Sequence, residues 1–145
     1  DNGSVVLVGQ SIGTAVAVEM ASRGYGSRMV LISPFLSLPA VAAAAIPWLY
    51  PAVKLMPWMV KDQFDSAAKV RAGAVKIPVR VVHGDQDEIV PVSQGREIFE
   101  LLRQQRGKDG APLPASLAII PGAGHNDLLG GPTEARVLDA MASPL

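Results

Sequence analysis

Three short segments of this chain carry side chains that could together perform nucleophilic catalysis. Residues 9–13 read G-Q-S-I-G and hold a serine, Ser11. Residues 83–91 hold three carboxylates, and residues 121–127 hold a histidine, His125. A serine becomes a nucleophile when a histidine accepts its proton and a carboxylate fixes the tautomer of that histidine. These residue types therefore predict acyl transfer through a serine.

The sequence around Ser11 is typical of a nucleophile elbow, a sharp turn between a strand and a helix. An apolar run precedes it at residues 5–8, and small helix-forming residues follow at 14–21. In such a turn the backbone of the serine is strained, which lifts its Oγ clear of the sheet. We expect Gly9 and Gly13 to let the strand and the helix pass closely, because a Cβ at either position would collide.

The rest of the chain alternates between apolar runs and helical patterns. Nearly continuous apolar residues, typical of parallel strands covered on both faces, occur at residues 5–8, 29–32, 79–82 and 117–120. Helical patterns occur at residues 12–22, 92–106 and 134–141. This alternation predicts a doubly wound α/β fold with a mostly parallel sheet. Since parallel strands end at one edge of the sheet, the loops that follow them should converge there.

Ser11 follows the first predicted strand, the carboxylate segment the third and His125 the fourth, which is the α/β-hydrolase chain order. The chain resembles the C-terminal half of an α/β-hydrolase of the serine-aminopeptidase-like group, and is especially similar to bud-emergence-type α/β-hydrolase-domain proteins. The matching segments are VVLVGQSIGTAVAVEMA, SPFLSLP, IPVRVVHGDQDEIVP and GAGHND. The resemblance implies that residues 1–145 form strands five to eight of that fold with their helices.

The resemblance also assigns roles to individual residues. Ser11 would be the nucleophile, Asp87 the orienting acid and His125 the base. From the residues alone Asp85 and Glu88 compete with Asp87, and the family pattern H-G-x-x-D selects Asp87.

Other polar residues of these segments have structural interpretations. His83, the second histidine, ends a predicted strand. We expect it to pack there or to support the following loop, which carries Asp87 and is called the acid loop below. Asn126 and Asp127 are expected to cap the last helix or to hold the histidine loop.

The mechanism implied is a two-step acyl transfer. His125 accepts the Ser11 proton during attack on a carbonyl, Asp87 stabilises the imidazolium, and water then hydrolyses the acyl-enzyme. The Ile12 N–H, at the start of the helix, should donate to the oxyanion, and Gln10 should line the substrate site. This mechanism requires no metal or organic cofactor.

Composition excludes several classes of protein. Thirteen basic and thirteen acidic residues cancel, so no net charge favours nucleic acid or anionic lipid as a partner. The absence of cysteine excludes a disulfide framework, a thiol nucleophile and cysteine-ligated metal. The compartment stays open, with a cytoplasmic or membrane-associated protein favoured over a secreted one.

The most apolar stretch, residues 38–60, lies between the second and third predicted strands, where α/β-hydrolases carry lids and acyl pockets. Prolines and a lysine within it argue against a continuous membrane-spanning helix. We therefore expect a lid-like insertion of short helices at about residues 37–66. Its large apolar side chains could line a site for a lipid-like acyl substrate, contact a membrane surface or cover the sheet as core. They are Trp48, Leu49, Leu55, Met56, Trp58 and Met59.

The resemblance implies that part of the fold is missing. In the family the second oxyanion donor comes from a loop after an earlier strand, and no earlier strand precedes residues 5–8 here. Right-handed crossovers should place the first three helical connections on one face of the sheet and only the last helix on the other, with residues 5–8 at an open edge. We expect the N-terminal half of the fold, from another chain or from further residues of this one, or a second copy, to cover this edge.

The sequence thus predicts a serine hydrolase that cleaves an ester, a thioester or an amide. The apolar insertion favours an ester or thioester, and a perhydrolase-like side activity would use the same three residues. The rival prediction is a catalytically inactive scaffold or partner-binding module, because a fold alone does not establish activity.

Overall fold

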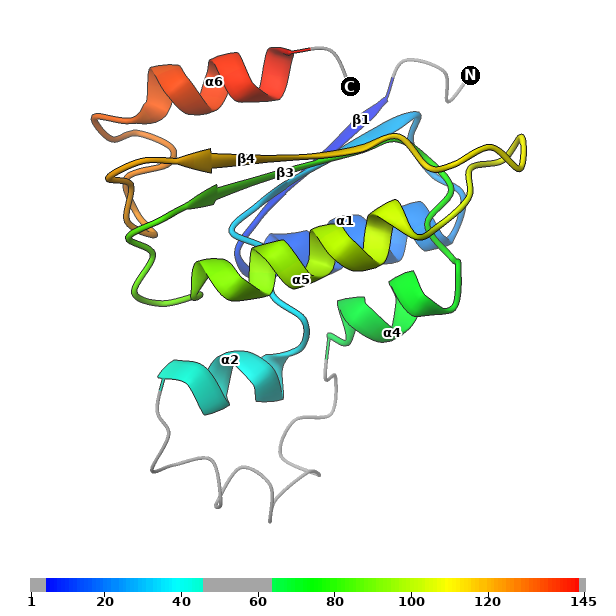
Figure 1. The fold of residues 1–145 in the computed structure, drawn as a ribbon, viewed down its shortest axis with the longest axis horizontal. Helices are drawn as coiled ribbons and strands as arrows, with labels where there is room; N and C mark the ends of the chain where they lie inside the picture. Colours follow the sequence, from blue (N-terminus) through cyan, green and yellow to red (C-terminus); the bar gives the residue numbers. More distant parts are fainter. Residues whose placement is uncertain (1–4, 46–63, 144–145) are drawn as a thin grey trace.

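A computed structural model describes residues 5–45 and 64–143 of the chain, with side chains for residues 5–41 and 64–143. Within these ranges the chain forms one parallel sheet whose four strands follow in the order β1-β2-β3-β4 (Figure 1). The strands are β1 (Val6–Gln10), β2 (Arg28–Ile32), β3 (Val79–Gly84) and β4 (Ala115–Ile120). The predicted fold class is confirmed, and every predicted apolar run overlaps one of these strands.

Helices connect the strands and follow the last of them. They are α1 (Ile12–Ser22), α2 (Leu38–Ala45), α4 (Ser66–Arg71), α5 (Val92–Arg103) and α6 (Glu134–Ala142). The prediction that one helix extends from residue 92 to 106 is wrong, because α5 ends at Arg103 and Arg106 already joins Pro112 in an isolated β-bridge. After α1, Gly24 takes a φ of +88°, which glycine adopts without strain.

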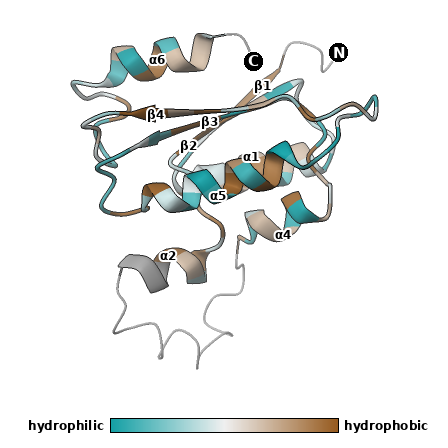
Figure 2. Cartoon of the chain, viewed as in Figure 1, coloured by the Kyte–Doolittle hydropathy of each residue, from teal (hydrophilic) through white to brown (hydrophobic). Residues whose placement is uncertain are grey.

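The helices divide between the two faces of the sheet as the right-handed crossover rule predicts. In Figure 1, α1, α4 and α5 lie below the sheet and α6 lies above it. Alternate strand residues therefore enter two separate cores. Met29, Leu31 and Val81 pack in the core with α1 and α5, whereas Val30 and Val82 pack in the core with α6. Figure 2 shows the strands largely hydrophobic and residues of both kinds on α5.

The strand β1 is an exposed edge of the sheet. The helix α6 contacts β3 and β4, and the Val6 and Val8 side chains on β1 stay 49% and 53% exposed. This agrees with the open edge predicted at residues 5–8. Together with exposed apolar residues of α1 these side chains form what we call the β1 surface. It consists of Val5, Val6, Val8, Ile12 and Val16.

The predicted insertion at about residues 37–66 is described only at its two ends. The first end is tied to α5 by Gln94, whose Oε1 accepts the Leu36 N–H at 3.1 Å. The second end leads into α4, where Asp65 caps the helix by accepting the Ala68 N–H at 2.7 Å. No helix of the described ranges is long and apolar enough to cross a bilayer. The predicted lining residues lie outside the described part of the chain: Trp48, Leu49, Leu55, Met56, Trp58 and Met59.

Candidate active site

The ends of β1, β3 and β4 bring Ser11, Asp87 and His125 into contact at one edge of the sheet. The Nε2 of His125 lies 3.0 Å from the Oγ of Ser11. The Nδ1 of the same ring lies 2.8 Å from Oδ2 and 3.0 Å from Oδ1 of Asp87. An ionised carboxylate only accepts hydrogen bonds, so Nδ1 donates and Nε2 of the neutral ring can accept from the Ser11 hydroxyl. Proton transfer from serine to histidine requires this arrangement.

Ser11 has the strained backbone that an elbow requires. Its φ of 50° and ψ of −120° place a non-glycine residue at positive φ, which costs about 1–3 kcal/mol. Its N–H donates to the Ile32 carbonyl at 2.9 Å and so continues the pairing of β1 with β2. Its carbonyl accepts the Thr14 N–H at 2.9 Å and the Thr14 hydroxyl at 2.6 Å. The serine is therefore held between the last strand bond of β1 and the first turn of α1.

Only one of the two elbow glycines is required for space. A Cβ on Gly9 would overlap the carbonyl oxygen of Gly13 and lie 2.8 Å from the Cα of Thr14, so the strand and the helix could not pass. A Cβ on Gly13 would meet no atom of the described residues within 4 Å. The expected collision at Gly13 is therefore wrong, because this position of α1 faces open space.

Asp87 is buried and held on both carboxylate oxygens. Its Oδ1 accepts the N–H of Ile89 at 3.0 Å and of Val90 at 2.8 Å, both from the loop of Asp87 itself. Its Oδ2 accepts the Ser33 hydroxyl at 2.7 Å, from the end of β2. The Nδ1–H of His125 is a further donor to Oδ2, so both oxygens of the carboxylate accept hydrogen bonds.

These donors decide the charge of the carboxyl group. Burial by itself would raise the pKa of Asp87. The nearby ring of His83 and the hydrogen bonds from Ser33, Val90 and His125 outweigh burial and hold this pKa well below its ordinary value. Asp87 is therefore ionised at every pH at which a histidine titrates.

Ser33 is a contact of the site that the sequence did not predict. It directly follows β2, is fully buried and has a φ of 48°. Its segment, SPFLSLP, has no spacing of polar residues that indicates chemistry. The signal that could have found it is its position. Ser33 directly follows β2, and β2 lies in the sheet between β1, which leads to Ser11, and β3, which leads to Asp87.

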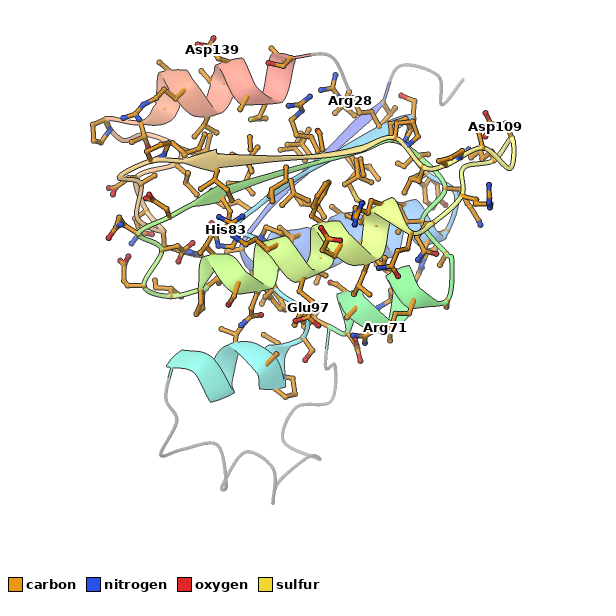
Figure 3. The ribbon with its side chains drawn as sticks, in the orientation of Figure 1. Arg28, Arg71, His83, Glu97, Asp109 and Asp139 are labelled. Atoms are coloured by element: carbon orange, nitrogen blue, oxygen red, sulfur yellow. The ribbon has the colours of Figure 1, made fainter. Side chains whose placement is uncertain are left out.

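His83, the alternative base, supports the acid loop instead. Its ring is fully buried between β3 and α5 (Figure 3). Its Nε2 lies 2.8 Å from the Val90 carbonyl oxygen and 3.5 Å from Oδ2 of Asp87, so the Nε2 proton is given to the nearer carbonyl. His83 thus fixes Val90, whose N–H binds Asp87. Gly95 makes room for the ring, because a Cβ there would overlap Nδ1 of His83.

Two further carboxylates tie the loops together. Asp85, one of the alternative acids, accepts the Gly122 N–H at 2.7 Å and so links the acid loop to the loop that follows β4. Asp127 accepts the Gly124 N–H at 3.0 Å, which is the loop-holding role expected of it. Glu88, the other alternative acid, is exposed.

The surroundings of Ser11 are more open. Ile12 begins α1, so its N–H has no acceptor inside the helix, and its side chain is 56% exposed. Gln10 ends β1 and is half-buried. Two clefts among the described residues, of about 280 and 500 Å³, include none of the three central residues. Within the same ranges no group of three or more histidine or acidic side chains is placed to hold a metal ion.

Comparisons with known sequences lead to one class of protein. No family model matches the chain. It is 36% identical over 124 residues to the α/β-hydrolase domain-containing protein aho-3 of Caenorhabditis elegans and 33% identical over 125 residues to human α/β-hydrolase domain-containing protein 17B. Each alignment covers 86% of this chain, with 31% of the first relative and 36% of the second. The chain thus spans about a third of the length of these relatives.

Solved structures share the same fold. An acylaminoacyl peptidase of Pyrococcus horikoshii matches 97% of this chain and 22% of its own, with a TM-score of 0.71 at 14% identity. The esterase PE8 matches 97% of this chain and 50% of its own, with a TM-score of 0.58 at 22% identity. At these identities the likeness concerns the fold alone.

The α/β-hydrolase fold is a parallel sheet with helices on both faces. In it an elbow serine meets a histidine and a carboxylate that follow later strands. The sequence relatives carry the same designation. The chain has the α/β-hydrolase fold, and its resemblance to α/β-hydrolase-domain proteins is confirmed.

Proposed function

We propose that this chain carries the catalytic residues of a serine hydrolase, with Ser11 as nucleophile, His125 as general base and Asp87 as the orienting acid. The main support is the continuous path from Oγ of Ser11 through both ring nitrogens of His125 to Asp87, with contacts of 3.0 and 2.8 Å. No other carboxylate of the described loops contacts His125 through a hydrogen bond.

In the proposed reaction Oγ of Ser11 attacks the carbonyl carbon of an ester, thioester or amide while Nε2 of His125 takes the hydroxyl proton. Asp87 stays ionised and stabilises the imidazolium, which then protonates the leaving group as its bond to the carbonyl carbon breaks. The acyl group remains on Oγ. A water molecule, deprotonated by His125, attacks this acyl-enzyme and releases the carboxylic acid and free Ser11.

The oxyanion of this reaction needs hydrogen-bond donors. The Ile12 N–H is the donor that the chain itself supplies, because it stands next to the nucleophile at the N-terminus of α1. In this fold a second donor comes from outside the segment that the chain spans. We therefore expect the rate of the isolated chain to be limited by oxyanion stabilisation, which is worth about 10²–10³-fold per donor.

We expect the substrate to have an apolar acyl group. The support is the apolar sequence of residues 38–60, which begins with α2 close to the acid loop's helix α5. An ester or thioester of a lipid-like acid fits such residues better than a peptide does. Peripheral contact with a membrane surface is part of the same proposal, because lipid-like substrates are held there.

We also propose that a further β-strand of the same fold pairs with β1. The β1 surface exposes apolar side chains of the edge strand β1 and of α1, which favours association. The relatives have two to three times the length of this chain, which is enough for further strands. Sedimentation of the 145-residue chain should show self-association, and a stable monomer at high concentration would contradict this proposal.

The experiment that tests the function is an esterase assay on the 145-residue chain and on any longer polypeptide that contains it. A series of p-nitrophenyl esters with acyl chains of two to sixteen carbons is compared with an acyl thioester and an anilide. We expect turnover to rise with acyl length and to disappear in Ser11→Ala. Turnover that persists in Ser11→Ala would overturn the proposed nucleophile.

A second candidate function is a binding module that keeps the fold without turnover. The exposed β1 surface favours it, because it fits a protein partner as well as a further strand. Turnover by neither form of the protein, together with binding of an acyl compound, would favour this alternative.

A further inference from the structure

Ser33 and Ser11 occupy equivalent places on neighbouring strands. Gln10 of β1 is in register with Ile32 of β2, so each serine directly follows its strand at the same level of the sheet. Both are non-glycine residues at positive φ, 50° for Ser11 and 48° for Ser33. The two differ in burial, because Ser11 is partly exposed and Ser33 is fully buried.

The conformation of Ser33 calls for a glycine, but the residue is a serine. Positive φ is strained for residues with a Cβ, and such strain persists where the surroundings or the function require it. The backbone N–H of Ser33 donates to the Val82 carbonyl at 2.9 Å, which a glycine would do equally well. What only the serine adds is the hydroxyl, and that hydroxyl donates to Oδ2 of Asp87 at 2.7 Å.

The two oxygens of Asp87 are held in different ways. Oδ1 is held by N–H groups of Ile89 and Val90, two and three residues further along the same loop. Oδ2, the nearer oxygen to Nδ1 of His125, is held by Ser33 from another strand, 54 residues away in sequence. Ser33 therefore fixes the rotation of the carboxylate relative to the sheet, which the acid loop by itself does not.

We propose that Ser33 is a positioning residue for the orienting acid: its hydroxyl fixes Oδ2 of Asp87 against Nδ1 of His125 and draws part of the carboxylate charge away from that ring. This proposal rests on the proposed serine-hydrolase function. The ring of His125 thereby stays aimed at Oγ of Ser11, and its imidazolium is stabilised less than a bare carboxylate would stabilise it.

Four other titratable side chains lie near the Asp87 carboxylate or in its loop: His83, His125, Asp85 and Glu88. His83 from β3 gives its Nε2 proton to Val90, and His125 comes from the loop after β4. Asp85 and Glu88 flank Asp87 in its own loop and are exposed. With the hydroxyl of residue 33 removed, the nearest ring nitrogens to Oδ2 among the described residues are Nδ1 of His125 at 2.8 Å and Nε2 of His83 at 3.5 Å, so more of the carboxylate charge acts on the His125 ring.

The test uses three substitutions at residue 33 and two readouts. Ser33→Ala removes the hydroxyl and keeps the Cβ, whereas Ser33→Gly removes the hydroxyl and also relieves the positive φ. Ser33→Cys keeps a weak donor of similar shape. The readouts are the titration midpoint of His125 by NMR, which is tractable because the chain has two histidines, and the rate of labelling by a fluorophosphonate probe.

We expect the titration midpoint measured for His125 to be higher in both Ser33→Ala and Ser33→Gly than in the parent chain, since both variants lose the charge-assisted hydrogen bond to Asp87. The labelling rate at pH 7 should fall about tenfold in both variants. Both readouts of Ser33→Cys should lie between those of the alanine and glycine variants and those of the parent chain. Ser66→Ala is the matched control, because the Ser66 hydroxyl is buried without a partner among the described residues, and it should change neither readout.

Two results would overturn the positioning role. One is a His125 midpoint and a labelling rate that stay within error of the parent in both Ser33→Ala and Ser33→Gly. The other is recovery of both readouts in Ser33→Gly, which would assign the effect of alanine to backbone strain. If the parent chain does not label at all, the proposed hydrolase function fails, while the His125 titration still decides the role of Ser33.

Discussion

The acid side of the candidate site and its nucleophile side are built differently. On the acid side Asp87 is 7% exposed and receives hydrogen bonds from its own loop, from Ser33 and from His125. On the nucleophile side Ser11 has one side-chain partner among the described residues, His125, and its neighbour Ile12 is 56% exposed. The acid side follows β3, which is paired on both sides, whereas the nucleophile side follows β1, an edge strand that among the described residues pairs with β2 alone.

This difference indicates which parts of the chemistry the chain determines by itself. The charge of Asp87, the tautomer of His125 and the aim of its Nε2 depend on contacts among described residues. The oxyanion donors and the substrate surface depend on Ile12 and on whatever covers the β1 surface. Changes on the acid side should therefore alter proton transfer, and changes on the nucleophile side should alter geometry and association.

The largest effect is expected from Asp87→Asn on the acid side. An amide in place of the carboxylate can donate to Nδ1 and so favours the wrong tautomer of His125, which lowers kcat by up to about 10⁴-fold in enzymes of this kind. Ester turnover or probe labelling measures the loss. Asp85→Asn, in the same loop but bonded to Gly122, is the control and should retain most of the activity.

On the nucleophile side we expect the largest loss of folding stability from a substitution at Gly9. A Cβ on Gly9 would overlap the Gly13 carbonyl, so Gly9→Ala must separate β1 from α1 at a cost of about 1–3 kcal/mol in the free energy of unfolding. Urea unfolding measures this cost. Gly13→Ala meets open space on a helix and should be neutral or stabilising by up to about 1 kcal/mol. Equal effects of the two substitutions would contradict the described elbow.

Lowering the pH should reduce the folding stability that the ionised Asp87 provides. Because the pKa of folded Asp87 lies below its ordinary value of 3.8, the stability that its ionisation provides is complete above about pH 4 and is lost as the pH falls through the folded pKa. Between pH 5 and pH 3 the parent chain should therefore lose more stability than Asp87→Asn does. Urea unfolding of both proteins across this range measures the difference, and parallel curves would count against a strongly held carboxylate.

The smallest effect on stability is expected at the β1 surface. Val8→Lys places a charge on an exposed edge strand, which should change the free energy of unfolding by about 0.5 kcal/mol or less but reduce self-association. Leu138→Lys is the control, because Leu138 is equally exposed but lies on α6. Sedimentation of the three proteins decides whether association depends on β1, and equal association of all three would show that it does not.

The sequence predicted the sheet well because each strand is a nearly continuous apolar run and the crossover rule leaves few topologies. It predicted Ser11 and His125 because their motifs stand directly after such strands. It did not reveal Ser33, since a lone serine bears no mark of its partner until β2 and β3 are paired in space. It also misjudged Gly13, because the G-x-S-x-G pattern does not say which glycine faces the strand. The role of residues 48–59 stays a prediction.

The most direct test of the whole account is to treat the protein with a fluorophosphonate probe and to map the adduct by mass spectrometry. Such probes react only with an activated serine. We predict a single adduct on Ser11 that is lost in His125→Ala although the serine is still present. An unlabelled Ser11, or labelling that survives in His125→Ala, would contradict the claim that Ser11, His125 and Asp87 act together.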